Sequence, residues 1–192
     1  YQSSFQIYDP GVSVNVYNDY VTINDNGTGS SSGNGDGILN SGETIELAIG
    51  VSNYGSENAT NITGTLSTEN SNITIINDSF TYGDLATGDI VNNASSPFTF
   101  SINNNVQHGA DINLLLTLTN DSGYNSVGYV GLNIAGKNLY AYGVDVVGNN
   151  QDVLVSGQTS TVHIELHNSG ATSAINIVGQ ITSASPAIEI LD

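Results

Sequence analysis

Apolar and polar residues alternate along most of the chain, in short runs separated by polar turns. Residues 5–24 carry apolar side chains at alternate positions on both sides of a turn at Asp9-Pro10-Gly11, and the alternation returns from Ile45 to Val51. Alternation of this kind indicates strands with one buried face. The same pattern predicts further strands at 62–66, 73–76, 98–102, 112–118 and 127–134.

Clusters of Asn, Ser, Asp and Gly separate these runs and predict turns at 69–71, 82–84, 103–105 and 120–123. No window repeats its apolar residues at the interval of an amphipathic helix. Short strands at regular spacing are typical of antiparallel sandwiches with Greek-key connections. We therefore expect an all-β protein built from tandem immunoglobulin-like antiparallel β-sandwiches.

The sequence repeats itself at an offset of 115 residues. Residues 38–77 align with 153–192 without a gap, and 13 of the 40 aligned positions are identical. Apolar positions keep the same parity, which a slip of one residue would reverse. The repeat predicts a complete module at 12–136 and the N-terminal half of an incomplete second copy at 137–192. Residues 1–11 would be a linker or the closing strand of a preceding module.

Residues 24–41 form a long connection of small polar residues that runs into the strand at 45–51. Loops of this length are uncommon in compact domains unless something holds them. Residues 32–43 match the calcium-loop template D-x-[DN]-x-[DN]-G-x5-E except at its first position, which is Ser32. The predicted Ca²⁺ ligands are Asp25, with Asn26 as the alternative, in place of Ser32, then Asn34, Asp36, the Ile38 carbonyl, Asn40 and Glu43. The alternative is a solvated hairpin loop without a metal.

Two other sequence features are weaker candidates for metal sites. The second copy has Asn149, Gln151 and Gln158 where the first has ligands, so we expect no metal there, or very weak binding. His163, Glu165 and His167 alternate on one strand and could bind zinc, but a solvated outer face is favoured.

Charge and composition narrow the function classes. The chain has 18 acidic residues and one basic residue, Lys137, for a net charge of −17. This charge repels nucleic acids and anionic lipids, so neither is an expected partner. There is no cysteine and no apolar run long enough to cross a bilayer, so direct membrane insertion is not expected.

The chain carries no recognisable catalytic constellation. Its carboxylates are scattered among turns, and its only G-x-S-x-G match, at residues 29–33, lacks the strand before and the helix after it that a nucleophile elbow needs. Ten tyrosines could stack on surface glycans, although core or rim packing is favoured. We expect a protein that is not an enzyme.

The runs at 34–47, 51–56 and 59–66 resemble a known family. They are similar to the immunoglobulin-like or CARDB-like (cell-adhesion-related) β-sandwich repeats of large secreted bacterial surface proteins, over about residues 12–136 and again 140–192. The resemblance implies an extracellular or cell-surface location, a spacing, stabilising or adhesive role, and metal binding at Asp36 and Glu43.

Together these features predict a non-enzymatic, calcium-stabilised structural or adhesion module whose partners are neighbouring modules of the same chain. One alternative is a self-assembling filament or adhesin subunit, completed by a strand from an identical neighbour. Another is an accessory domain of a secreted hydrolase.

Overall fold

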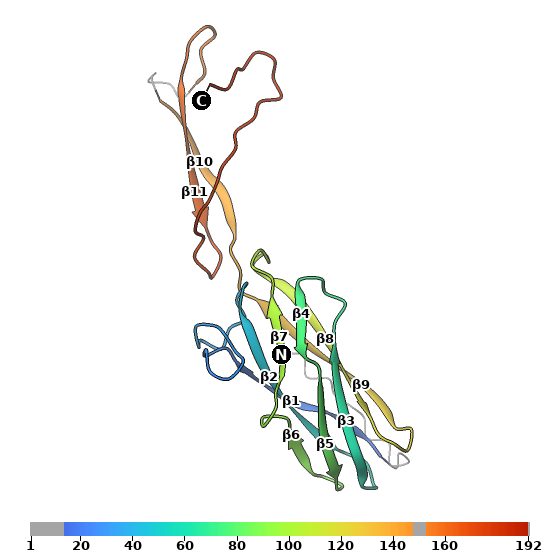
Figure 1. Ribbon diagram of the computed structural model, residues 1–192. Coiled ribbons are helices and arrows are strands. Elements are labelled where there is room, and N and C mark those ends of the chain that lie inside the picture. The colour runs from blue at the N-terminus through green and yellow to red at the C-terminus, as the bar shows by residue number, and fades with distance from the viewer. Residues whose placement is uncertain (1–13, 148–152, 192) are drawn as a thin grey trace. The chain divides into compact units, whose positions relative to one another are not determined.

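The computed structural model describes residues 14–147 and 153–191, and all regular secondary structure in them is β-strand (Figure 1). The predicted all-β class is confirmed. The predicted strand around Phe5 and Ile7 lies outside the described residues. In the described part of the chain no helix could cross a membrane. The chain divides into two compact units, Tyr1–Lys137 and Asn138–Asp192.

Two antiparallel sheets make up the first unit. One has the order β1-β2-β7-β4, with β6 also paired to β2, and the other has the order β5-β3-β8-β9. The strands are β1 (Val16–Asn24), β2 (Thr44–Asn53), β3 (Ala59–Ser67), β4 (Ile73–Asn77), β5 (Ser79–Leu85), β6 (Ile90–Asn92), β7 (Phe98–Ile102), β8 (Ala110–Thr119) and β9 (Asn125–Ile134).

The strand order of this unit is that of an immunoglobulin-type sandwich. The seven strands of a constant-type domain form the sheets A-B-E-D and C-F-G. When β5 and β6 are set aside, the first unit has the same order, with β1 to β4 as A to D and β7 to β9 as E to G. The two additional strands lie between D and E.

Both sheets contribute to one hydrophobic core. Along β2 the inward positions 45, 47, 49 and 51 are all fully buried, as alternation predicts. From the second sheet, β8 contributes its own alternating buried row. The largest buried side chains are Phe98, Phe100, Ile45, Leu47, Ile49, Ile62, Leu66, Leu85, Ile112, Leu114, Leu116 and Leu118.

The turn predicted at 82–84 is wrong, because these residues lie inside β5. Gly83 does have the left-handed backbone typical of a turn, with φ of 83°, but here it marks an irregularity in the pairing of β5 with β3. Tyr82 beside it is buried. A glycine within a strand often marks a bulge in this way.

A buried asparagine bridges the gap between β6 and β7, which pair with the same edge of β2. The Asn93 side chain accepts a hydrogen bond from the Ile49 amide at 2.6 Å and donates one to the Leu47 carbonyl at 3.4 Å. Asn93 is fully buried. Its amide therefore satisfies backbone groups that a strand residue would otherwise pair.

Replacing Asn93 should destabilise the first unit. Asn93→Ala leaves the Ile49 N–H buried without this partner, which costs about 1–3 kcal/mol of unfolding free energy. Urea unfolding measures the loss, and Asn105→Ala, at an exposed position, serves as the control. Equal stability of the two variants would contradict the bridging role.

Tyr82 connects the two sheets through its hydroxyl, which donates to the Ile49 carbonyl at 3.2 Å. Burial raises the pKa of the Tyr82 hydroxyl above its ordinary value. The folded state therefore favours the neutral phenol. The stability that this preference contributes is complete below the unfolded-state pKa, near ~10, and is lost as pH rises above it.

The alkaline unfolding limb should therefore depend on Tyr82. Tyr82→Phe has no ionisable group, so its unfolding free energy should fall less steeply above pH ~10 than that of the wild type. Denaturant unfolding at a series of pH values measures this slope. Tyr129→Phe, at an exposed position, should leave the slope unchanged, and an identical slope in all three proteins would disprove the assignment.

The described residues of the second unit contain one antiparallel hairpin, of β10 (Leu139–Val147) and β11 (Thr161–Asn168). The tandem organisation, with the N-terminal half of a second immunoglobulin-like module at 137–192, therefore remains a prediction.

Candidate metal site

The loop between β1 and β2, residues 25–43, is attached to β2 through Ser30 and Ser32. Ser32 and Thr44 exchange two backbone hydrogen bonds, of 2.8 and 2.9 Å. The Glu46 carboxylate, on β2, accepts hydrogen bonds from the Ser30 amide at 2.7 Å and from the Asn24 side chain at 2.8 Å. These contacts hold the first half of the loop against the hairpin.

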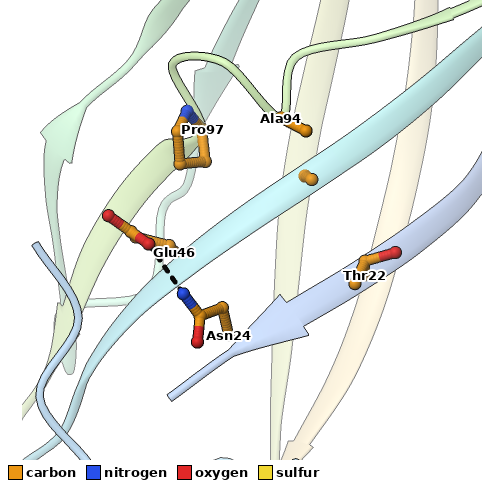
Figure 2. A pocket seen from close by; sticks show the side chains of 6 residues that line it. Thr22, Asn24, Glu46, Ala94 and Pro97 are labelled. Atoms are coloured by element: carbon orange, nitrogen blue, oxygen red, sulfur yellow. Dashed lines mark hydrogen bonds between the residues drawn. The ribbon is translucent and has the colours of Figure 1, made fainter. Parts of the chain in front are cut away.

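Glu46 also lines a small pocket of about 200 Å³ on the β1–β2 hairpin. Figure 2 shows its hydrogen bond to Asn24 beside the pocket. Glu46 is the only charged residue of the lining, so the pocket offers no pair of acid and base groups. The other lining residues are Thr22, Asn24, Ala48, Ala94 and Pro97.

Asp25 takes a central place in the loop. Its side chain is 3% exposed, and both carboxylate oxygens lie 3.3 Å from the Gly37 amide. The Asp25 carbonyl accepts the Gly35 amide at 3.3 Å. The Asp25 carboxylate thus faces the middle of the loop. A residue that replaces Ser32 as the first metal ligand would need this orientation. The backbone and the side-chain oxygen of Ser32 are both hydrogen-bonded to Thr44.

Glu43 closes the other end of the loop and is 9% exposed. One carboxylate oxygen accepts the Asn40 amide at 2.8 Å, and the other accepts the Asn40 side chain at 3.2 Å. The same Asn40 nitrogen donates to the Ile38 carbonyl at 2.9 Å. Glu43, Asn40 and the Ile38 carbonyl therefore form one cluster of oxygen-bearing groups.

Gly33 lies against both buried carboxylate residues. A Cβ atom at this position would come within 2.4 Å of the Asp25 carbonyl oxygen and within 3.0 Å of the Asp25 Cβ and the Glu43 Cδ. The absence of a side chain at Gly33 therefore lets Asp25 and Glu43 approach each other. Sequence reasoning missed this residue; its signal was a glycine between two carboxylates in a loop that must bring them together.

Asn34 and Asp36 lie on the exposed side of the loop. The Asp36 carboxylate accepts the Ile38 amide at 2.8 Å and the Asn34 side chain at 2.9 Å, and the Asn34 carbonyl oxygen accepts the Asp36 amide at 3.0 Å. These two side chains bond to each other and to nearby backbone, in the manner of Asx turns.

Three of the six predicted ligand residues, Asp25, Asn40 and Glu43, are therefore buried. The carbonyl of the exposed Ile38 is bonded to Asn40, and Asn34 and Asp36 lie in an exposed turn. Among the described residues no three His, Cys, Asp or Glu side chains are grouped closely enough to hold a metal ion by themselves. The donors of the loop are carboxylate, amide and carbonyl oxygens. Such a set suits a hard cation that takes several oxygen ligands, such as Ca²⁺, rather than zinc.

The two weaker candidates lie in the second unit. His167 on β11 packs against the rings of Tyr140 and Tyr142, with centroid distances of 5.4 and 5.7 Å. His163 and Glu165 are exposed on the same strand. The loop positions Asn149 and Gln151 lie outside the described residues, whereas Gln158 is exposed.

The close approach at Gly33 can be tested directly. Gly33→Ala forces the new methyl group against the Asp25 backbone and should cost about 1–3 kcal/mol, as overpacking does elsewhere. Gly131→Ala is the matched control, because its Cβ would meet only the Asn113 side chain at 3.8 Å. Thermal unfolding of both variants measures the difference, and an unaffected Gly33→Ala protein would contradict this geometry.

A scan against protein-family models found no match for the chain, and a search of curated proteins found none either. The resemblance to cell-surface repeats therefore stays a prediction that depends on the loop and repeat residues themselves.

Proposed function

We propose that the chain is a non-enzymatic, calcium-stabilised structural or adhesion module of a secreted cell-surface protein. One observation carries the proposal: Asp25 and Glu43 are both buried, on either side of Gly33, in one loop. Burying ionised carboxylates costs several kcal/mol each unless a positive charge compensates them.

The chain has almost no basic side chains that could supply that positive charge. Lys137 is its only basic residue apart from three histidines. The amide groups that the two carboxylates accept compensate part of the desolvation cost, but they carry no net charge. A bound divalent cation supplies the missing positive charge. Asp25, Glu43, Asn40 and the Ile38 carbonyl would hold it, and Asp36 would join from its exposed turn.

The role of the ion in this proposal is to stabilise the fold. A cation that binds the folded loop, and not the unfolded chain, raises stability by mass action. The loop connects the first two strands of the first sheet, so ordering it fixes the β1–β2 hairpin. Calcium is abundant outside cells, and the net charge of −17 would also benefit from bound cations there. This supports the proposed extracellular location.

Calcium should therefore raise the melting temperature. At a free calcium concentration 100-fold above the dissociation constant, the ion adds about 2.7 kcal/mol to the unfolding free energy. Glu43→Gln and Asp25→Asn should each lose most of this calcium-dependent shift. The measurement is a thermal melt in calcium and in EDTA, with magnesium at the same concentration as a comparison.

Glu69→Gln is the matched control, because Glu69 is an exposed carboxylate away from the loop. It should keep the full calcium response. A wild-type protein with the same melting temperature in calcium and in EDTA would refute the proposal.

A further inference from the structure

The hairpin β10–β11 has the same strand register as β1–β2. Val16 lies opposite Asn53 in the first hairpin, and Leu139 lies opposite Asn168 in the second. The sequence repeat aligns Asn53 with Asn168. Each residue of one hairpin therefore has a defined equivalent in the other, and the first unit shows which face of the hairpin points away from the core.

The outer face of the second hairpin differs in chemistry from that of the first. On β2 the residues between the inward core positions are Ala48, Gly50 and Ser52. Their equivalents on β11 are His163, Glu165 and His167. Because successive side chains of a strand alternate, these three lie on the face opposite to the equivalents of the β2 core residues. The fold of the hairpin does not require them, since β1–β2 forms without them.

Three rings gather on this outer face. Tyr140 lies directly opposite His167, and their ring centroids are 5.4 Å apart. The centroid of the Tyr142 ring lies 5.7 Å from that of His167. Tyr140 is 44% exposed and Tyr142 is 68% exposed. The hairpin therefore presents a ring cluster, Tyr140, Tyr142 and His167, at its surface.

A β-bulge directs Tyr142 to the ring cluster. The strand pairing shifts between Ala141 and Gly143, so Tyr142 is the additional residue on β10. The first hairpin has a shift at the same place, and its additional residue is Asp19, which is exposed. Bulges redirect side chains and are frequent beside functional sites. The outward direction of Tyr142 is therefore a property of the hairpin itself.

Two carboxylates lie beside the ring cluster. The Glu165 side chain lies over Gly143, the residue that follows Tyr142, because a Cβ at Gly143 would come within 3.4 Å of Glu165 Oε2. Asp145 lies two residues further along β10, opposite His163. In the described part of the chain neither carboxylate has a hydrogen-bond or ion-pair partner. Both are available to a ligand.

Exposed tyrosine faces beside carboxylates suit an organic cation. A cation above a tyrosine ring is attracted by the negative face of the ring, and a carboxylate beside it accepts charge-assisted hydrogen bonds. A guanidinium group does both at once, because it is planar, stacks on rings and donates pairs of N–H groups to a carboxylate. A lysine ammonium is a compact, strongly hydrated charge and stacks less well.

We propose that the outer face of β10–β11 binds arginine side chains of a positively charged polypeptide. The guanidinium group stacks on the rings of Tyr140 and Tyr142 and donates hydrogen bonds to Glu165, while Asp145 adds a second negative charge. The proposal goes beyond the calcium role, because this site lies in the second unit and uses no residue of the β1–β2 loop.

The charge of the chain favours such a partner. A net charge of −17 attracts basic polypeptides and accelerates their association. The 192 residues contain no arginine, and Lys137 is the single lysine. A second copy of these residues therefore cannot supply the ligand. A neutral saccharide would also stack on the tyrosine rings, but it would gain nothing from the net charge.

The test adds capped peptides of glycine and serine to the full 192-residue chain and follows the ring signals of Tyr140, Tyr142 and His167 by NMR. The peptides carry two arginines, two lysines or two citrullines, and citrulline keeps the shape of arginine without its charge. The arginine peptide should shift these signals in a saturable manner. The lysine peptide should bind more weakly, and the citrulline peptide should give no shift.

Four variants locate the site. Tyr142→Ala should weaken binding of the arginine peptide about 2- to 5-fold, as expected for an exposed cation–π contact, and Tyr142→Phe should restore it. Glu165→Gln should weaken binding by at least as much, because it removes a charge-assisted hydrogen bond. The matched controls Tyr129→Ala and Glu69→Gln, at exposed positions of the first unit, should keep the wild-type affinity.

Three results would overturn the proposal. The first is equal affinity for the arginine and citrulline peptides. The second is equal weakening by the control variants, since that would assign binding to the net charge alone. The third is binding of a neutral oligosaccharide, such as maltohexaose, at these rings without binding of the arginine peptide. The affinity should be the same in calcium and in EDTA, so a failure of the metal proposal leaves this test intact.

Discussion

The central feature of this account is a pair of carboxylates, Asp25 and Glu43, that are both buried in one loop of a chain with almost no positive charge. Asp25 and Glu43 approach each other across Gly33, and each lies in the interior of the β1–β2 loop. Amide donors satisfy their hydrogen-bonding capacity in part, but they do not neutralise the charge. Under the proposed function a bound cation supplies the missing charge, so the stability of the loop would depend on the cations in solution.

The same constraint explains how a polar loop of 19 residues can belong to a compact sandwich. Glu46 and the Ser32–Thr44 pair hold its first half to β2 through hydrogen bonds that need no ion. In the second half, the Asp25 carboxylate accepts the Gly37 amide and the Glu43 carboxylate accepts the Asn40 amide. Under the proposed function, the order of this second half would depend on a bound cation.

Alternation of apolar residues was sufficient to predict most strands of the first unit, because each has one face in a shared core. Alternation did not predict β5 or β6. Gly83 interrupts the alternation in β5, and β6 is only three residues long. The spacing of the loop template selects Glu43, and Asp25 is buried in the same loop; metal binding by either residue stays a prediction. The template could not place the Asp36 carboxylate, which bonds within its own turn, or identify Gly33, whose importance comes from contacts distant in sequence.

The most direct test of this account is anomalous diffraction from crystals grown in calcium. The account predicts a calcium peak inside the β1–β2 loop, with oxygen ligands from Asp25 and Glu43 at the 2.3–2.6 Å typical of Ca²⁺. A well-ordered loop with no peak, and with both carboxylates still buried and bonded only to amide groups, would contradict it.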